Sequence, residues 1–419
     1  MNRRLGILAL VFLGIVISYV DRGNLSIAAP SIMRDFRIPP ATMGILLSAF
    51  FWTYGVFQLP AGAVVDRFGI RRTYASGFLL WSLASASIAL SRGPGDVVGM
   101  RMALGLAESI GPLASLTWIR NNFQGREQGL PTAIYIAGQS VGPALGALAG
   151  SLLLDRFGWR MMFGITGLGA LLWLPCWWFT VPSDGTHTAQ PAENEPEDRA
   201  DPSALNWQAL FISPTFWSLS FCILLSSYYW YFVLTWVPAY LTLTRGFSTT
   251  EMGRVVSTGL FAVAATNVVS GYAADKLAAR IGVFRSRLLF AVAGYTATAA
   301  ILLLLVVRDR AWVLPILTLA MCATGTGNSC FWAIVQHVTR RNLAGRTIGY
   351  LNTLSQIAGA AAPLITGWLL GPQKQFGPAI LVAGVCPVLA AICLLANGTR
   401  GLESTKVFLA GSRNRQIAQ

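Results

Sequence analysis

Charged residues are scarce in this sequence: Asp, Glu, Lys and Arg make up 11% of its 419 residues. Soluble domains carry about 25%. Hydrophobic residues reach 54%, and the mean hydropathy is +0.57. This balance excludes a soluble globular domain and indicates an integral membrane protein, with room for about twelve spans of roughly 20 residues.

The residues that build metal sites and catalytic centres are also few. The chain has two histidines and six cysteines. The cysteines fall inside apolar segments without metal-ligand spacing, and neither histidine belongs to a partner motif. A phosphate-binding Walker loop is absent from the sequence, which excludes a self-contained ATP-driven pump. We therefore expect no metal site, no bound cofactor and no enzyme activity.

The net charge of +14 raises the possibility of nucleic-acid binding, but no basic soluble domain with interleaved aromatic residues exists here. The charge instead fits Lys and Arg retained in cytoplasmic loops. The first apolar run is too long for the h-region of a signal peptide, so we expect no cleavable signal. The expected partners are a lipid bilayer and small molecules, with no nucleic acid.

Apolar runs predict twelve membrane-spanning helices in two groups of six. The first group covers 5–30, 42–65, 73–91, 97–119, 128–154 and 160–181, and the second covers 214–243, 249–274, 287–307, 311–338, 347–371 and 377–397. An acidic stretch rich in Pro, Ser and Thr separates them and predicts a flexible linker. The predicted domains are a bundle at 1–181, a linker at 182–213, a bundle at 214–397 and a tail at 398–419.

Lys and Arg are about twice as frequent in the termini, the linker and the loops on their side as in the opposite loops. The positive-inside rule therefore places both termini in the cytoplasm, and we expect a multi-pass protein of the cell inner membrane that acts as a monomer.

The two predicted bundles repeat each other in sequence. GAVVDRFGIRR (62–72) is echoed by GYAADKLAARIG (271–282), and NFQGREQG (122–129) is echoed by NLAGRTIG (342–349). Two six-helix halves that repeat in parallel are typical of major facilitator transporters, which bind substrate between the halves near the membrane midplane.

The motifs also resemble a known family. The 62–72 segment is similar to the signature loop of the major facilitator superfamily. SYVDRGNLSIAAP (18–30) and GLAESIGP (105–112) resemble its anion:cation symporter family, which includes bacterial galactonate, glucarate and hexuronate transporters and the animal vesicular glutamate and sialic acid transporters. The resemblance covers essentially the whole chain. It implies an all-α integral membrane protein with the major facilitator fold, twelve helices forming two six-helix bundles related by a pseudo-two-fold axis.

Away from the ends of the predicted spans, charges are confined to the first half: Asp21, Arg22, Arg101 and Glu108. Such charges are costly in a bilayer and mark ion or substrate pathways. We hypothesise that Arg22 binds a substrate carboxylate through its planar fork. Asp21 and Glu108 would form the proton-coupling pair, with Arg101 balancing their charge. The alternative is a buried salt-bridge network that only holds the two helices together.

Polar side chains at similar depth are candidates for hydrogen bonding to substrate hydroxyls. The resemblance implies that Tyr54, Gln139, Ser329 and Asn352 line the substrate cavity, and Tyr19 is a further candidate. An aromatic run at 228–232 either stacks on substrate or packs between helices. Loop residues with the appearance of cytoplasmic gate contacts are Asp66, Arg67, Arg71, Arg126 and Asp275.

Glycines recur every fourth residue from Gly138 to Gly150. They predict a close helix contact, although they also partly resemble a motif of antiporters.

These observations together predict a proton-coupled symporter that imports an organic anion, most simply a sugar acid such as galactonate or a hexuronate. A single Arg at the centre, and the lack of charge inside the spans of the second half away from their ends, argue for a substrate with one carboxylate. An aromatic or dicarboxylic acid transporter and an anion exchanger remain alternatives within transport. A transporter-like sensor or a membrane enzyme is a more remote alternative, because no signalling domain or catalytic constellation is recognisable.

Overall fold

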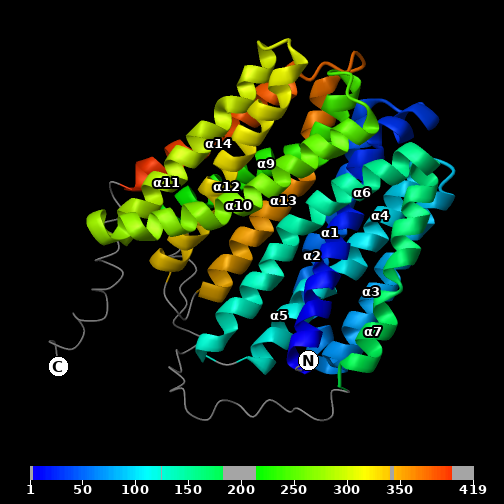
Figure 1. The fold of residues 1–419 in the computed structure, drawn as a ribbon, viewed down its shortest axis with the longest axis horizontal. Helices are drawn as coiled ribbons and strands as arrows, with labels where there is room; N and C mark the ends of the chain where they lie inside the picture. The colour runs from blue at the N-terminus through cyan, green and yellow to red at the C-terminus, as the bar shows by residue number, and fades with distance from the viewer. Residues whose placement is uncertain (1–2, 124, 183–213, 340–343, 399–419) are drawn as a thin grey trace. The chain divides into compact units, whose positions relative to one another are not determined.

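The computed structural model describes residues 3–123, 125–182, 214–339 and 344–398. These residues form helices and no strand (Figure 1). The predicted linker and C-terminal tail lie almost wholly outside the described residues. In the first half the helices are α1 (Arg3–Asp35), α2 (Pro40–Phe68), α3 (Ile70–Ser87), η1 (Ile88–Leu90), α4 (Pro94–Glu108), α5 (Ile110–Asn122), η2 (Gly125–Gln128), α6 (Gly129–Ala170) and α7 (Trp173–Thr180).

The described helices of the second half begin after the acidic stretch. They are α9 (Pro214–Leu243), α10 (Thr249–Ile281), α11 (Val283–Thr298), η4 (Ala299–Leu305), η5 (Arg310–Trp312), α12 (Val313–Val338), α13 (Ala344–Leu370) and α14 (Gly377–Gly398). Several of them extend beyond the predicted apolar ranges, because helices continue past the hydrocarbon region into polar turns.

Eleven helical stretches of the described residues are long and apolar enough to cross a membrane. The longest of them, Gly129–Thr180, includes two predicted spans. Gly158 interrupts it with φ 76° and ψ 170°, a conformation that glycine adopts without a steric penalty. The break separates the predicted helices 128–154 and 160–181, so every expected span has a counterpart, and the all-α membrane fold is confirmed.

Contacts group the chain into two compact units. The first comprises Met1–Glu195, Tyr231–Ala264 and Gly359–Ala379, and the second comprises Pro196–Trp230, Ala265–Ala358 and Ile380–Gln419. The first unit therefore includes segments from the predicted second half, whose boundaries stay a prediction. Each unit has its own hydrophobic core.

Close packing of α1 against α6 dominates the first unit, and Figure 1 shows these helices side by side. The glycine stripe of α6 forms this contact: a methyl group at Gly142 would lie 2.6 Å from Cβ of Tyr19, and one at Gly146 would lie 3.1 Å from Cα of Val20. Small residues let helix backbones approach closely in a membrane. The stripe is thus a packing surface that fixes α1, the helix that carries Asp21 and Arg22.

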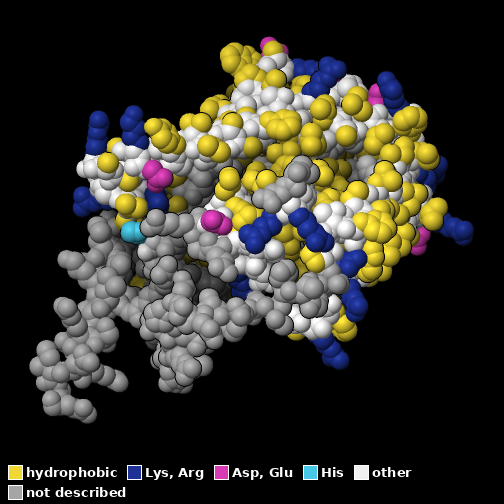
Figure 2. Space-filling view, turned by 60° about the horizontal axis from the view of Figure 1, so that its bottom comes forward, with side chains coloured by type: hydrophobic (Ala, Val, Ile, Leu, Met, Phe, Trp, Pro, Cys, Tyr) yellow, Lys and Arg dark blue, Asp and Glu magenta, His cyan; other side chains and the backbone are white. Residues whose placement is uncertain are grey.

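Large apolar side chains cover much of the outer surface of the described residues. Leu172 is 78% exposed and Phe179 is 82% exposed, and Figure 2 shows hydrophobic side chains spread across the visible face. Such a surface is unfavourable in water and suits a lipid environment.

Candidate functional site

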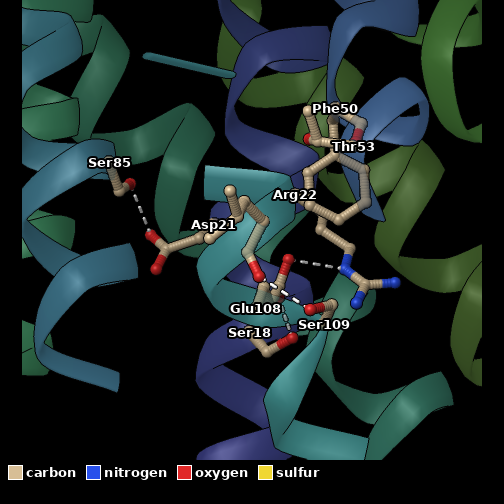
Figure 3. A network of polar contacts seen from close by, with 9 residues as sticks. Ser18, Asp21, Arg22, Phe50, Thr53, Ser85, Glu108 and Ser109 are labelled. Carbon is tan, nitrogen blue, oxygen red and sulfur yellow. Dashed lines mark hydrogen bonds and ion pairs between the residues drawn. The ribbon is translucent and has the colours of Figure 1, made fainter. Parts of the chain in front are cut away.

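An ion pair between α1 and the end of α4 forms the centre of the candidate site. Arg22 Nε lies 3.0 Å from Glu108 Oε2, and Glu108 is 1% exposed while Arg22 is 14% exposed. Ser18 Oγ donates a hydrogen bond to the other carboxylate oxygen, Oε1. Figure 3 shows Glu108 between Ser18 and Arg22. The carboxylate is thus held by two groups that lie one turn apart on α1.

Three aromatic rings surround the guanidinium group of Arg22. Its Cζ atom lies 4.6 Å from the ring centre of Tyr19, 4.8 Å from that of Phe50 and 4.4 Å from that of Tyr54. The rings of Phe50 and Tyr54 stack 5.0 Å apart. Aromatic faces attract cations and restrict their motion. Arg22 Nη2 is buried and has no hydrogen-bond partner among the described residues. This nitrogen is therefore available to donate a hydrogen bond to a ligand.

Asp21 points to a different side of α1 from Arg22 (Figure 3). Its Oδ1 atom accepts a hydrogen bond of 3.0 Å from Ser85 Oγ of α3. Its Oδ2 atom is buried and has no hydrogen-bond partner within the described segments. Adjacent residues on a helix do not face each other, which explains why the two charges have separate surroundings.

Arg101 is 2% exposed on α4. Its guanidinium lies 5.2 Å from the ring centre of Phe50, and its Nε and Nη1 atoms have no hydrogen-bond partner in the described part of the chain. Phe50 therefore lies beside both Arg22 and Arg101. Asp21, Arg101 and Glu108 are the buried charged side chains of the described residues, and all three belong to the first half.

The position of Glu108 depends on a close crossing of α2 and α4. A methyl group at Gly105 would lie 2.6 Å from Thr53 Oγ1, and this hydroxyl donates a 2.6 Å hydrogen bond to the carbonyl oxygen of Met102. α4 ends at Glu108, where Ser109 retains helical angles of φ −58° and ψ −24° before α5 begins. The crossing brings the carboxylate level with Ser18 and Arg22.

Two aromatic residues of the 228–232 run, Tyr231 and Phe232, belong to the same unit as this site. The ring of Tyr231 on α9 lies 4.9 Å from that of Phe51, which in turn lies 5.2 Å from Phe50. Tyr229 is fully buried, as is Phe232. Tyr231 therefore lies near the aromatic rings that surround Arg22, whereas Tyr229 and Phe232 pack in the protein interior.

The other predicted polar residues are spread over both units. Gln139 is partly buried on α6, next to Gly138 in the stripe that contacts α1. Ser329 on α12 belongs to the second unit, where its hydroxyl lies 3.0 Å from that of Ser270. Asn352 is partly buried on α13 in that unit.

The predicted gate residues lie at helix ends. Asp66 and Arg67 are exposed at the end of α2. Arg71 Nη2 donates a 2.6 Å hydrogen bond to the carbonyl oxygen of Trp178, and Asp275 Oδ1 lies 3.5 Å from Arg287 Nη2 within the second unit. The side chain of Arg126 lies outside the described residues.

Sequence reasoning missed three residues of the site: Ser18, Phe50 and Ser85. Ser18 precedes Arg22 by four positions, a spacing that places both on one helix face, so a signal was available. Phe50 likewise precedes Tyr54 by four positions on α2. Ser85 is one of several serines in α3, and only the packing of α3 beside α1 singles it out.

Comparison with known proteins places this architecture in a family. The profile of the Major Facilitator Superfamily matches residues 11–363. The hexuronate transporter of Bacillus subtilis (strain 168) is 25% identical over 398 residues, covering 94% of each chain. The D-galactonate transporter of Escherichia coli O6:H1 is 26% identical over 411 residues, covering 93% of this chain and 94% of its own.

Solved structures share the fold at lower sequence identity. A bacterial homolog of the human lysosomal transporter Spinster, in an inward-facing and occupied conformation, superimposes with a TM-score of 0.76 at 16% identity and 98% coverage of both chains. A D-xylose-proton symporter gives a TM-score of 0.74 at 16% identity, covering 94% of this chain and 97% of its own. The profile match, the sugar-acid transporters among the relatives and the shared fold lead to one conclusion: the chain is a multi-pass membrane transporter, not an enzyme, and belongs to the major facilitator superfamily.

Proposed function

We propose that this protein is a proton-coupled symporter that imports an organic anion with one carboxylate, of the sugar-acid class, by alternating access. The observation that carries the proposal is the ion pair between the buried Glu108 and the partly buried Arg22, whose guanidinium lies among three aromatic rings. The relatives named for hexuronate and D-galactonate transport support the substrate class.

Arg22 is the proposed carboxylate-binding residue. Its guanidinium is held by Glu108 through Nε, whereas Nη2 has no hydrogen-bond partner among the described residues. A planar guanidinium suits bidentate binding of a carboxylate. The hydroxyl groups of Tyr19 and Tyr54 lie on rings that touch this cation and are suited to hydrogen-bond the substrate. We extend the proposed cavity lining to Gln139, Ser329 and Asn352.

Competition for Arg22 supplies the proposed coupling. A substrate carboxylate that binds Arg22 displaces Glu108 from the cation with which it pairs among the described residues. A buried carboxylate without a cation is costly, so binding a proton then stabilises it. Substrate and proton would thereby favour each other's binding, as reciprocal linkage requires.

Asp21 is the proposed second proton-coupling residue. It is 1% exposed, and among the described residues its carboxylate accepts a hydrogen bond from the hydroxyl of Ser85. Arg101, which lies on α4 with its guanidinium beside Phe50, would balance the negative charge of Asp21 and Glu108.

The absence of a buried cation from the described residues of the second half favours a monocarboxylate over a dicarboxylate. A second carboxylate would need another positive group to offset its loss of hydration. An aromatic acid is the second candidate substrate, because the rings of Tyr19, Phe50 and Tyr54 could stack on an aromatic ring as well as on a sugar face.

The proposal also covers the oligomeric state, the membrane location and the cytoplasmic gate. The protein would act as a monomer in the cell inner membrane, with both termini in the cytoplasm and the proton gradient in place of a cofactor. Asp66, Arg67, Arg71, Arg126 and Asp275 would stabilise one of the two conformations at the cytoplasmic helix ends.

Uptake into proteoliposomes tests the function. Purified protein is given an inward proton gradient and a panel of labelled acids: galactonate, glucuronate, glucarate and benzoate. We expect accumulation of a monocarboxylate sugar acid, which is abolished by a protonophore. Glu108→Gln should lose gradient-driven accumulation while still exchanging labelled for unlabelled substrate across the membrane. Unchanged accumulation in both Glu108→Gln and Asp21→Asn would disprove the coupling, and benzoate uptake alone would select the aromatic acid.

A further inference from the structure

An apolar groove lies between α3 and α7, away from the Arg22 site. Its volume is about 510 Å³, and its lining residues are Arg72, Ala75, Ser76, Leu79, Leu174, Pro175, Trp178 and Phe179. Both helices belong to stretches long and apolar enough to cross a membrane. The groove therefore opens on the surface that lipid covers.

A layer of stacked aromatic rings joins the two helices that form the groove. Behind the groove, the rings of Phe78 and Trp173 stack 4.1 Å apart, and Trp173 stacks on Trp177 at 4.9 Å. The indole nitrogen of Trp177 donates a 3.1 Å hydrogen bond to the carbonyl oxygen of Arg71. Because this aromatic layer holds α7 on α3, the backbone walls of the groove are part of the fold.

The open side of the groove is apolar and exposed. Trp178 is 44% exposed and Phe179 is 82% exposed, while Leu79 is 40% exposed. In a bilayer these side chains meet hydrocarbon, and a hollow between them is filled most favourably by an acyl chain.

One end of the groove carries positive charge. Arg72 is exposed in the first turn of α3 and has no hydrogen bond or ion pair with any described residue. Its neighbour Arg71 is held in place, with its Cζ atom 4.4 Å from the ring centre of Trp178. Figure 2, turned to bring forward the end where the N-terminus lies, shows Lys and Arg side chains beside hydrophobic ones.

The juxtaposition of a free guanidinium and an apolar groove matches one chemical class. We propose that this groove binds an anionic phospholipid, with one acyl chain between α3 and α7 and the phosphate paired with Arg72. The dipole of α3 reinforces the attraction, because Arg72 lies at the positive end of an 18-residue helix. Zwitterionic lipids fill the same groove with lower affinity, since a basic side chain near a membrane surface attracts anionic lipids.

Fluorescence quenching by brominated lipids tests this site on the full-length protein in bilayers. The bromine atoms on an acyl chain quench a nearby tryptophan, and the difference between wild type and Trp178→Phe isolates the signal of Trp178. We expect brominated phosphatidylglycerol to quench this signal at about fivefold lower mole fraction than brominated phosphatidylcholine, the effect of one basic residue.

Two variants and one control complete the test. Arg72→Gln should abolish the preference for phosphatidylglycerol, whereas Arg120→Gln, at an exposed arginine that does not line the groove, should keep it. Ser76→Phe should fill the groove and reduce quenching by both lipids. Equal quenching by the two lipids in the wild type, or an unchanged preference in Arg72→Gln, would overturn the proposal. Transport is not measured, so this outcome is independent of the proposed symport.

Discussion

At the scale of single residues, Arg22 takes part in more polar and aromatic contacts than any other charged group of the site. It lies 3.0 Å from Glu108 and within 4.8 Å of three ring centres. A lysine at this position would keep the positive charge. It would lose the two-point hydrogen bonding to a carboxylate and the planar stacking on aromatic rings. Whether substrate binding needs the planar guanidinium, and not only its charge, can be tested directly.

Arg22→Lys should raise the half-saturation concentration for the transported acid by about 10–100-fold, because a charge-assisted hydrogen bond contributes about 1.5–3 kcal/mol. Initial uptake rates over a range of substrate concentrations measure this. Arg120→Lys is the matched control and should behave as wild type. An unchanged half-saturation concentration in Arg22→Lys would remove Arg22 from the binding site.

Ser85 is a second residue whose effect is specific. Its hydroxyl donates to Asp21 Oδ1, so Ser85→Ala should alter proton-driven accumulation while leaving substrate affinity within about twofold. The expected change in the accumulation rate is about tenfold, from the loss of one hydrogen bond to a charged group.

The matched control for Ser85 is Ser87→Ala on the same helix, since the Ser87 hydroxyl donates to the backbone carbonyl oxygen of Ala84. Accumulation and equilibrium binding are measured in parallel. A parallel loss of binding in Ser85→Ala would show that Asp21 contributes to the substrate site rather than to coupling.

At the scale of elements, the α1–α6 contact holds the site in place. Gly142 meets both Cβ of Tyr19 and the carbonyl oxygen of Val16, which a methyl group would approach to 2.6 and 2.8 Å. Because Tyr19 belongs to the cage around Arg22, any displacement of α1 is passed directly to the cation.

Gly142→Ala should therefore lower the melting temperature of the detergent-solubilised protein, with overpacking costing about 1–3 kcal/mol. Gly164→Ala, in the part of α6 beyond the break at Gly158, meets no atom within 4 Å and should be neutral or slightly stabilising, because alanine favours a helix. Thermal unfolding followed by intrinsic fluorescence compares the two. Equal melting temperatures would mean that α1 can shift without cost.

The elements also show what sequence alone can predict. The spans and the confinement of charge to the first half follow from hydropathy and residue type. The separation of Asp21 from Arg22 was accessible in principle, because neighbouring helix positions diverge. The pairing of Asp21 with Ser85 was not, since several serines of α3 are equivalent until α3 packs beside α1 at a particular rotation.

At the scale of the whole molecule, the first compact unit joins segments from both sequence halves. A methyl group at Gly253 of α10 would lie 2.7 Å from the carbonyl oxygen of Ala147 in α6, and one at Gly367 of α13 would lie 2.6 Å from that of Pro40 in α2. Alternating access requires such contacts between the halves to form and separate in each cycle.

Gly253→Ala should disfavour the conformation that contains this contact, shifting the equilibrium by about 5–150-fold for an overpacking cost of about 1–3 kcal/mol. Uptake rates should fall, while binding of substrate to purified protein remains measurable. Gly271→Ala, on the same helix with no atom within 4 Å, is the control. Normal uptake in Gly253→Ala would show that this contact does not open during transport.

The covalent adjacency of Asp21 and Arg22 has a mechanical consequence. The two side chains leave α1 on different sides, one toward Ser85 and the other toward Glu108 (Figure 3). A rigid helix that rotates or tilts carries both through the same angle. In the proposed transport cycle, the events at the two carboxylates are therefore synchronised by a single peptide bond, without a relay of intervening side chains.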